Sequence, residues 1–123
     1  MKHVLVIDDQ ESMLSITSQM LKDQGYQVTT AGDGEEGLRL FESNPATFNL
    51  VMCDVNMPKV NGFEVLNKIK SNRPKLPVIL LTGTNEDVAS YVGKEYKADA
   101  IIKKPFVIEE VMTAIKQIIS SSQ

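Results

Sequence analysis

The sequence has few of the residues that build covalent cross-links or soft-metal sites. Its 123 residues include one cysteine, Cys53, and one histidine, His3. A single cysteine excludes an internal disulfide and a cysteine-based zinc site, and a single histidine excludes a histidine-cluster metal site. Because Cys53 lies inside an apolar run, we expect a buried and unreactive thiol. His3 begins a strand-like run and is assigned no chemistry.

Long apolar segments and an excess of positive charge are also missing. No run is long enough to span a bilayer, and His3–Ile7 already reads as a strand, so we expect no signal peptide, no membrane association and a cytoplasmic protein. The formal net charge of -3 argues against direct nucleic-acid binding. The length suits one compact domain over residues 1–123 with no output domain, and no repeat or linker interrupts it.

Short apolar runs alternate with segments of helical periodicity. The runs predict five buried strands at His3–Ile7, Gln27–Thr30, Leu50–Asp54, Val78–Leu81 and Ala100–Ile102. Alternation of this kind predicts a doubly wound α/β domain, with a five-stranded parallel sheet and helices on both faces.

Five helices are expected between and after these strands. The first spans Gln10 to about Asp23, with an inner face of Met13, Ile16, Thr17, Met20 and Leu21. The inner faces of the next two carry Leu38 and Phe41 after an acidic start at Asp33 and Glu36, and Phe63, Leu66 and Ile69 after Asn61-Gly62. The fourth is short, is capped by Thr84 and carries Val88, Tyr91 and Val92. The last helix buries Ile108, Val111, Met112, Ile115, Ile118 and Ile119.

Polar side chains stand where four of the predicted strands end. Asp8 and Asp9 follow the first strand, Asp54 ends the third, Thr82 follows the fourth and Lys104 follows the fifth. Parallel strands end at one edge of a sheet, where open α/β folds bind ligands, so we expect these groups to converge. Each of them alone also has an ordinary structural interpretation, as a turn residue, a helix cap or a solvated charge. Their joint placement is the specific observation.

Three carboxylates in one crevice require a cation, because like charges at close range repel. Oxygen ligands in a small acidic pocket favour Mg²⁺. The backbone carbonyl of Asn56 could reach the same ion, Lys104 would offset further negative charge, and Thr82 offers a hydroxyl. These are the parts needed for phosphoryl transfer to a carboxylate, with Asp54 as the best nucleophile and Asp8 and Asp9 as a metal-binding pair.

Four motifs in this order resemble the receiver domain of two-component response regulators. They are Val4-Leu5-Val6-Ile7-Asp8-Asp9, Asp54-Val55-Asn56-Met57-Pro58 through Asn61-Gly62, Leu81-Thr82-Gly83 and Lys104-Pro105-Phe106. The resemblance covers nearly the whole chain. It implies the flavodoxin-like strand order 2-1-3-4-5, and a phosphoryl group donated to Asp54 by a histidine kinase or a histidine phosphotransfer protein.

The resemblance also implies roles for the other site residues. Asp9, Asp54 and the Asn56 carbonyl bind Mg²⁺, or in second place Mn²⁺, and Asp8 acts through water. Thr82 and Lys104 contact the phosphoryl oxygens. As a hypothesis of how the switch works, we expect the readout face to consist of the fourth helix, the fifth strand and the last helix, with Thr82, Tyr91, Ile101 and Lys103. Asn56 and Thr84 flank the expected path of the attacking water, so we expect them to tune the lifetime of the phosphoryl group.

The partners follow from the same resemblance. We expect a protein that acts by docking to a downstream target protein, as a monomer or, in second place, as a phosphorylation-linked dimer. It assists its own phosphorylation and dephosphorylation but is not an enzyme with a separate substrate.

Two positions depart from the family pattern. Ile101 stands where the family often has Tyr or Phe, so the aromatic rotamer switch is absent and coupling is expected to run through Thr82, the loop after it and the fourth helix. A glycine that the family usually carries near Lys97 is also missing, so the exact shape of that turn does not follow from the resemblance.

Three other functions fit the sequence less well. A phosphatase of the haloacid dehalogenase type also forms an aspartyl phosphate, but it needs a second acid two residues after the nucleophile, whereas Asp8 is followed by Asp9 and Gln10. A flavin-binding module would place its phosphate loop after the first strand and would be repelled by three acids. A pseudo-receiver that only binds partners is disfavoured by the complete set of acids, threonine and lysine.

Overall fold

The computed structural model describes residues 2–83 and 98–121, with the side chains of the last helix described as far as Ile118. Five parallel strands form one sheet in the order β2-β1-β3-β4-β5. They are β1 (His3–Ile7), β2 (Gln27–Ala31), β3 (Leu50–Asp54), β4 (Val78–Thr82) and β5 (Ala100–Lys103). The predicted doubly wound fold and its 2-1-3-4-5 order are confirmed.

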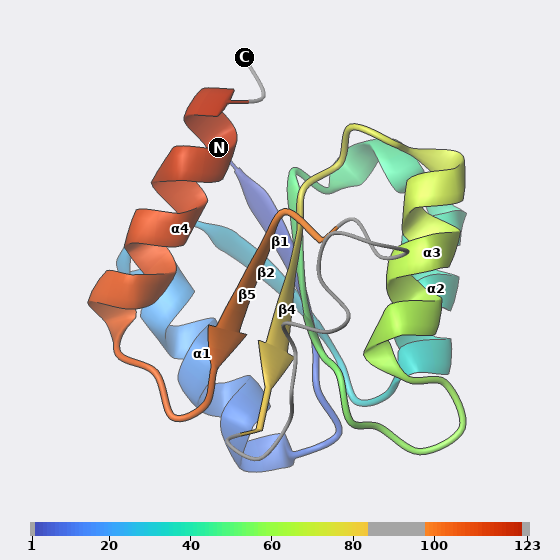
Figure 1. Ribbon diagram of the computed structural model, residues 1–123, viewed down its shortest axis with the longest axis horizontal. Coiled ribbons are helices and arrows are strands. Elements are labelled where there is room, and N and C mark those ends of the chain that lie inside the picture. Colours follow the sequence, from blue (N-terminus) through green and yellow to red (C-terminus); the bar gives the residue numbers. More distant parts are fainter. Residues whose placement is uncertain (1, 84–97, 122–123) are drawn as a thin grey trace.

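Helices cover both faces of the sheet. They are α1 (Glu11–Asp23), α2 (Gly34–Ser43), α3 (Gly62–Asn72) and α4 (Ile108–Ser121). Figure 1 shows α1 and α4 on one side of the sheet and α2 and α3 on the other. Within the described ranges, no helix combines the length and the apolar character needed to cross a membrane. The predicted helix with Thr84 and Tyr91 falls in residues 84–97, outside the described part of the chain.

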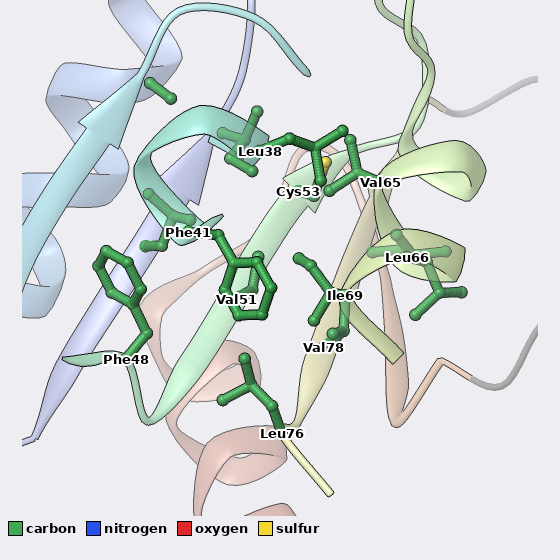
Figure 2. Close-up of a cluster of buried hydrophobic side chains, with 14 of the residues drawn as sticks. Leu38, Phe41, Phe48, Val51, Cys53, Val65, Leu66, Ile69, Leu76 and Val78 are labelled. Carbon is green, nitrogen blue, oxygen red and sulfur yellow. The ribbon is translucent and has the colours of Figure 1, made fainter. Parts of the chain in front are cut away.

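The sheet separates two apolar cores, because successive residues of a strand point to opposite faces. Under α2 and α3 the core includes the strand residues Leu5, Ile7, Val51, Cys53, Val78 and Leu80. Under α1 and α4 it includes Val4, Val6, Leu50, Met52, Ile79 and Leu81. Figure 2 shows the first of these cores, with Phe41 of α2 and Ile69 of α3 packed near Val51. Burial on both faces explains why the strands are continuous apolar runs.

The inner face of α1 differs from the prediction. Leu21, Thr17 and Ser18 are buried, whereas Ile16 is 53% exposed. The buried stripe is therefore shifted around the helix, and the assignment of Ile16 to the core was wrong. Two small polar side chains, Thr17 and Ser18, thus occupy the buried face in place of a large apolar residue.

The starts of α2 and α3 are capped as their sequences indicate. Asp33 Oδ1 accepts a hydrogen bond from the Glu36 amide at 2.8 Å. Asn61 and Glu64 form a reciprocal capping box at the start of α3. The 3₁₀ turn η1 (Pro45–Thr47) was not predicted beyond a helix break. The Arg73 guanidinium donates hydrogen bonds to two carbonyls in this region, which fixes the turn against the end of α3.

At the edge of the sheet where the strands begin, Asp99 clamps β4 to β5. Its Oδ2 accepts hydrogen bonds from the Val78 amide and from Lys70 Nζ, each at 2.8 Å. The Asp99 amide in turn donates to the Val78 carbonyl at 2.9 Å. Lys70 also donates to the Leu76 carbonyl at 2.8 Å, so the clamp includes the last turn of α3.

We predict that Asp99→Ala lowers the free energy of unfolding by about 2 kcal/mol, because it leaves the Val78 amide and the Lys70 ammonium without their carboxylate. Urea denaturation measures the change. Asp23→Ala is the matched control, because Asp23 accepts one exposed hydrogen bond from Gln19 and its loss should cost under about 0.5 kcal/mol. Equal effects of the two substitutions would contradict the clamp.

Candidate functional site

The ends of the strands bring the predicted polar groups together. β3 lies between β1 and β4, and β5 pairs with β4. Asp54 is in register with Leu81, the residue before Thr82. Lys104 Nζ lies 2.8 Å from Asp8 Oδ2 and 3.4 Å from Asp54 Oδ1. The lysine after β5 thus reaches the acids after β1 and at the end of β3, as the sequence predicted.

Asp8, Asp9 and Asp54 form a cluster that could hold a metal ion. One carboxylate oxygen from each lies within 4.8 Å of the others. Asp8 and Asp54 are buried, whereas Asp9 is exposed. Hard oxygen ligands with one side open to water suit Mg²⁺, which retains several of its waters. The donor set therefore fits the predicted ion.

Burial makes the ionised form of Asp54 costly. Removal of this carboxyl from water raises its pKa to about 6, Lys104 opposes the rise, and the Asp8 charge adds to it. Burial disfavours the charge on Lys104 as well, but the hydrogen bond to Asp8 and the Asp54 charge outweigh it and raise the lysine pKa. Asp54 is therefore ionised at neutral pH, and Lys104 is a cation beside it.

The pKa shift of Asp54 predicts a pH-dependent stability in metal-free protein. A folded-state pKa above the ordinary value of 3.8 stabilises the fold below pH 4, and this contribution is lost as the pH rises through about 6. Asp54→Asn removes the ionisable group. Its gain in unfolding free energy over wild type should grow by about 2 kcal/mol between pH 4 and pH 7.

Denaturant titrations in EDTA at several pH values measure this difference. A gain that is constant across this pH range would contradict the assignment of a raised pKa to Asp54. Glu42→Gln, at an exposed position on α2, is the control for removal of a surface carboxylate.

Thr82 is completely buried, and its hydroxyl has no hydrogen-bond partner among the described residues. A buried polar atom in this state calls for an explanation, because each unpaired group costs about 1–3 kcal/mol. The Thr82 carbonyl, by contrast, accepts the Lys104 amide at 2.7 Å. Thr82 is thus joined through its backbone to the lysine of the site, while its side-chain hydroxyl has no partner in the described part of the chain.

The loop after β3 contains one residue in the left-handed conformation and returns close to the end of the strand. Lys59 has a φ of 68°, and the Val60 amide bonds to the Pro58 carbonyl at 2.8 Å. A Cβ on Gly62 would lie 2.6 Å from the Asp54 carbonyl oxygen, so only glycine fits there. The sequence signals this loop by Asn61-Gly62, but the close approach to Asp54 was not predicted.

Other predicted residues lie around this cluster. The Asn56 side chain is exposed in the loop after Asp54, and the position of its carbonyl as a metal ligand stays a prediction. Ile101 is half-buried against the core under α3, and Lys103 is exposed at the end of β5. Cys53 is buried, and burial together with the Asp54 charge raises the pKa of its thiol, which stays protonated. The expectation of a buried, unreactive thiol is thus supported.

The family model for the response regulator receiver domain matches residues 4–116. The chain belongs to this family. This match confirms the resemblance inferred from the four motifs. Receiver domains are signalling domains of two-component systems rather than classical enzymes. The match favours this assignment over the phosphatase and the flavin-binding module.

Curated relatives support the assignment. The chain is 35% identical over 122 residues to the alkaline phosphatase synthesis transcriptional regulatory protein PhoP of Bacillus subtilis, covering 99% of this chain and 50% of PhoP. It is also 35% identical to the CpxR homolog of Haemophilus influenzae, covering 99% of this chain and 52% of that protein. The chain thus spans about half the length of these relatives.

Solved structures show the same fold at similar length. A receiver domain protein from Clostridium thermocellum superposes with a TM-score of 0.91 at 34% identity, covering 98% of this chain and 96% of that one. The chemotaxis protein CheY4 of Vibrio cholerae gives a TM-score of 0.85 at 32% identity, with 96% and 98% covered. TrrA of Thermotoga maritima, solved with Mg²⁺-BeF, gives 0.84 at 30% identity, with 96% and 99% covered.

Proposed function

We propose that this receiver domain is a phosphorylation-controlled switch that accepts a phosphoryl group on Asp54 in a Mg²⁺-dependent reaction. The phosphoryl donor is a phosphohistidine of a histidine kinase or a histidine phosphotransfer protein. The observation that carries the proposal is the cluster of three carboxylates with the Lys104 ammonium 3.4 Å from Asp54. It is supported by Thr82 at the end of the neighbouring strand, whose buried hydroxyl has no partner among the described residues.

The chemistry follows from the charges in the cleft. The Asp54 carboxylate attacks phosphorus, the bond to the histidine nitrogen breaks, and the freed imidazole keeps that electron pair and takes up a proton. Asp8 and Asp9 would help hold a Mg²⁺ ion, which supplies positive charge to the transferring phosphoryl oxygens. Lys104 offsets the charge on the same group, and Thr82 donates a hydrogen bond to it.

Phosphorylation changes the partners of Lys104 and Thr82. In the unmodified domain Lys104 is paired with Asp8 and Asp54. A phosphoryl group adds about 1.5–2 negative charges and new acceptor oxygens, which draw the ammonium and the hydroxyl toward it. Because the Thr82 carbonyl holds the Lys104 amide, this movement is shared by the ends of β4 and β5.

The readout face lies next to these two strand ends. It comprises β5, α4 and the segment with Thr84 and Tyr91 that follows β4. An open groove between β5 and α4 is lined by residues that include Ile101, Lys103, Glu109 and Glu110. We propose that a downstream target protein docks here. The curated relatives are named as transcriptional regulatory proteins, so we propose a target protein that controls transcription.

The principal alternative is a pseudo-receiver that binds partners without phosphorylation. The complete set of residues argues against it, because one lysine offsets only part of the charge of the buried Asp8 and Asp54, and the buried Thr82 hydroxyl has no partner in the described part of the chain. Phosphorylation experiments distinguish the two functions directly.

We predict that acetyl phosphate with Mg²⁺ adds one phosphoryl group to the wild-type domain and none to Asp54→Asn. Intact mass measures the modification, and beryllofluoride with Mg²⁺ should shift the backbone NMR signals of the wild type only. Lys104→Met should weaken the response to beryllofluoride by about tenfold or more, because it removes the cation beside the acceptor.

Glu42→Gln serves as the control for loss of a carboxylate far from the cleft and should be labelled like wild type. Equal labelling of wild type and Asp54→Asn would show that Asp54 is not the acceptor. Absence of labelling and of any beryllofluoride response in the wild type would support the pseudo-receiver instead.

We also predict that Asn56 tunes the lifetime of the phosphoryl group. Its side chain is exposed two residues after Asp54, beside the path that an attacking water must take. Asn56→Ala and Asn56→Arg should change the dephosphorylation rate by about threefold to tenfold, because positioning of the water controls this step. Decay of the phosphorylated mass measures the rate, and unchanged rates in both variants would remove the role. Thr84 is proposed to act in the same way.

A further inference from the structure

We propose that Gly34, at the start of α2, is a positioning residue for the cation and phosphoryl site, because it determines where loop 55–61 lies. The inference rests on the proposed function, since it concerns the same Mg²⁺ site. Gly34 belongs to a different element from every residue assigned to the site.

Gly34 allows an unusually close contact between α2 and this loop. A Cβ on Gly34 would lie 2.7 Å from the Val60 carbonyl oxygen, 3.0 Å from Val60 Cβ and 3.1 Å from its Cγ1. The closest of these atoms belongs to the backbone, so no side-chain rotation relieves the clash. Any residue other than glycine must therefore move either the loop or the helix.

The start of α2 is the more strongly fixed of the two partners. Asp33 caps the Glu36 amide, and Glu36 Oε1 accepts the Gly32 amide at 2.6 Å. Ala31, the residue before this turn, accepts a hydrogen bond on its carbonyl oxygen from the Asp8 amide at 3.1 Å. The helix start is thus tied to the acidic end of β1, and a larger residue at position 34 displaces the loop.

The loop itself transmits such a displacement toward the site. The Gly62 amide bonds to the Val55 carbonyl at 3.0 Å, which holds the two ends of the loop together. Val60 and Pro58 are joined by a tight turn, with Lys59 at a φ of 68°. These two hydrogen bonds restrain the short segment between Asn56 and Val60. A shift at Val60 therefore also moves the Asn56 peptide, whose carbonyl is the proposed metal ligand.

A Mg²⁺ site is sensitive to shifts of this size. The ion requires nearly octahedral ligands at about 2.0–2.1 Å, so a loop displaced by a few tenths of an ångström offers a poorer ligand. Residues that orient metal ligands typically change metal affinity by about tenfold to a hundredfold when replaced.

The test is a Mg²⁺ titration of the full chain by isothermal calorimetry and by NMR. Gly34→Ala should raise the Kd for Mg²⁺ about tenfold at a temperature where the variant is folded. Gly32→Ala is the matched control in the same turn, because its Cβ would meet only Glu36 Oε1, at 3.7 Å. Gly37→Ala is the control for stability, because its Cβ would clash with the Ile7 side chain in the core. Both controls should keep the Kd within about twofold of wild type.

The outcomes separate the inference from the proposed function. A Gly34→Ala domain that is less stable but binds Mg²⁺ like wild type would overturn the positioning role and leave the proposed function intact. No Mg²⁺ binding by wild type would overturn the proposed function itself. If Gly34→Ala does not fold, Val60→Ala tests whether the position of the loop affects the ion, since loss of its two methyl groups loosens the packing of the loop beside Gly34. It should raise the Kd about threefold, and an unchanged Kd would overturn the inference.

Discussion

Repulsion between three clustered carboxylates is the constraint on which the rest of the structure depends. Asp8, Asp9 and Asp54 come from neighbouring strands, and two of them are buried. Lys104 offsets part of their charge, and the remainder makes the cleft receptive to a cation. The site is therefore electrostatically incomplete in the protein alone. Binding of a cation, or a change in the charge at Asp54, alters the electrostatic interactions of Asp54 with Asp8 and Lys104. A switch requires such a difference in interaction energy between its two states.

The sequence predicted the sheet and the cleft well because both follow from short-range patterns. Apolar runs such as Leu50–Asp54 are readable as buried strands, and the residues that end them fall on one edge by the geometry of parallel sheets. Three acids and a lysine could thus be placed together without knowledge of any distance. The helix start at Asp33 followed from an equally local pattern, whereas Asn61-Gly62 marked the start of α3 without predicting its capping box.

The features that the sequence did not predict are contacts between helices, strands and loops. Ile16 was assigned to the inner face of α1 from helical periodicity, but the buried side of the helix carries Thr17, Ser18 and Leu21. The clamp at Asp99 joins residues from three elements. The contact of Gly34 with Val60, and of Gly62 with Asp54, depends on the separation of two backbones. Periodicity carries no information about such separations.

The alternation of the strands between two cores has a consequence for how this domain can change. Within β3, Cys53 faces one core and Met52 the other, and Asp54 follows at the mouth. Deletion or insertion of one residue between Leu50 and Asp54 would reverse every side chain beyond that point. Cores of this kind accept many exchanges of one apolar residue for another, but the spacing from the strand start to the phosphoacceptor candidate is fixed. Variation in length is therefore confined to the loops.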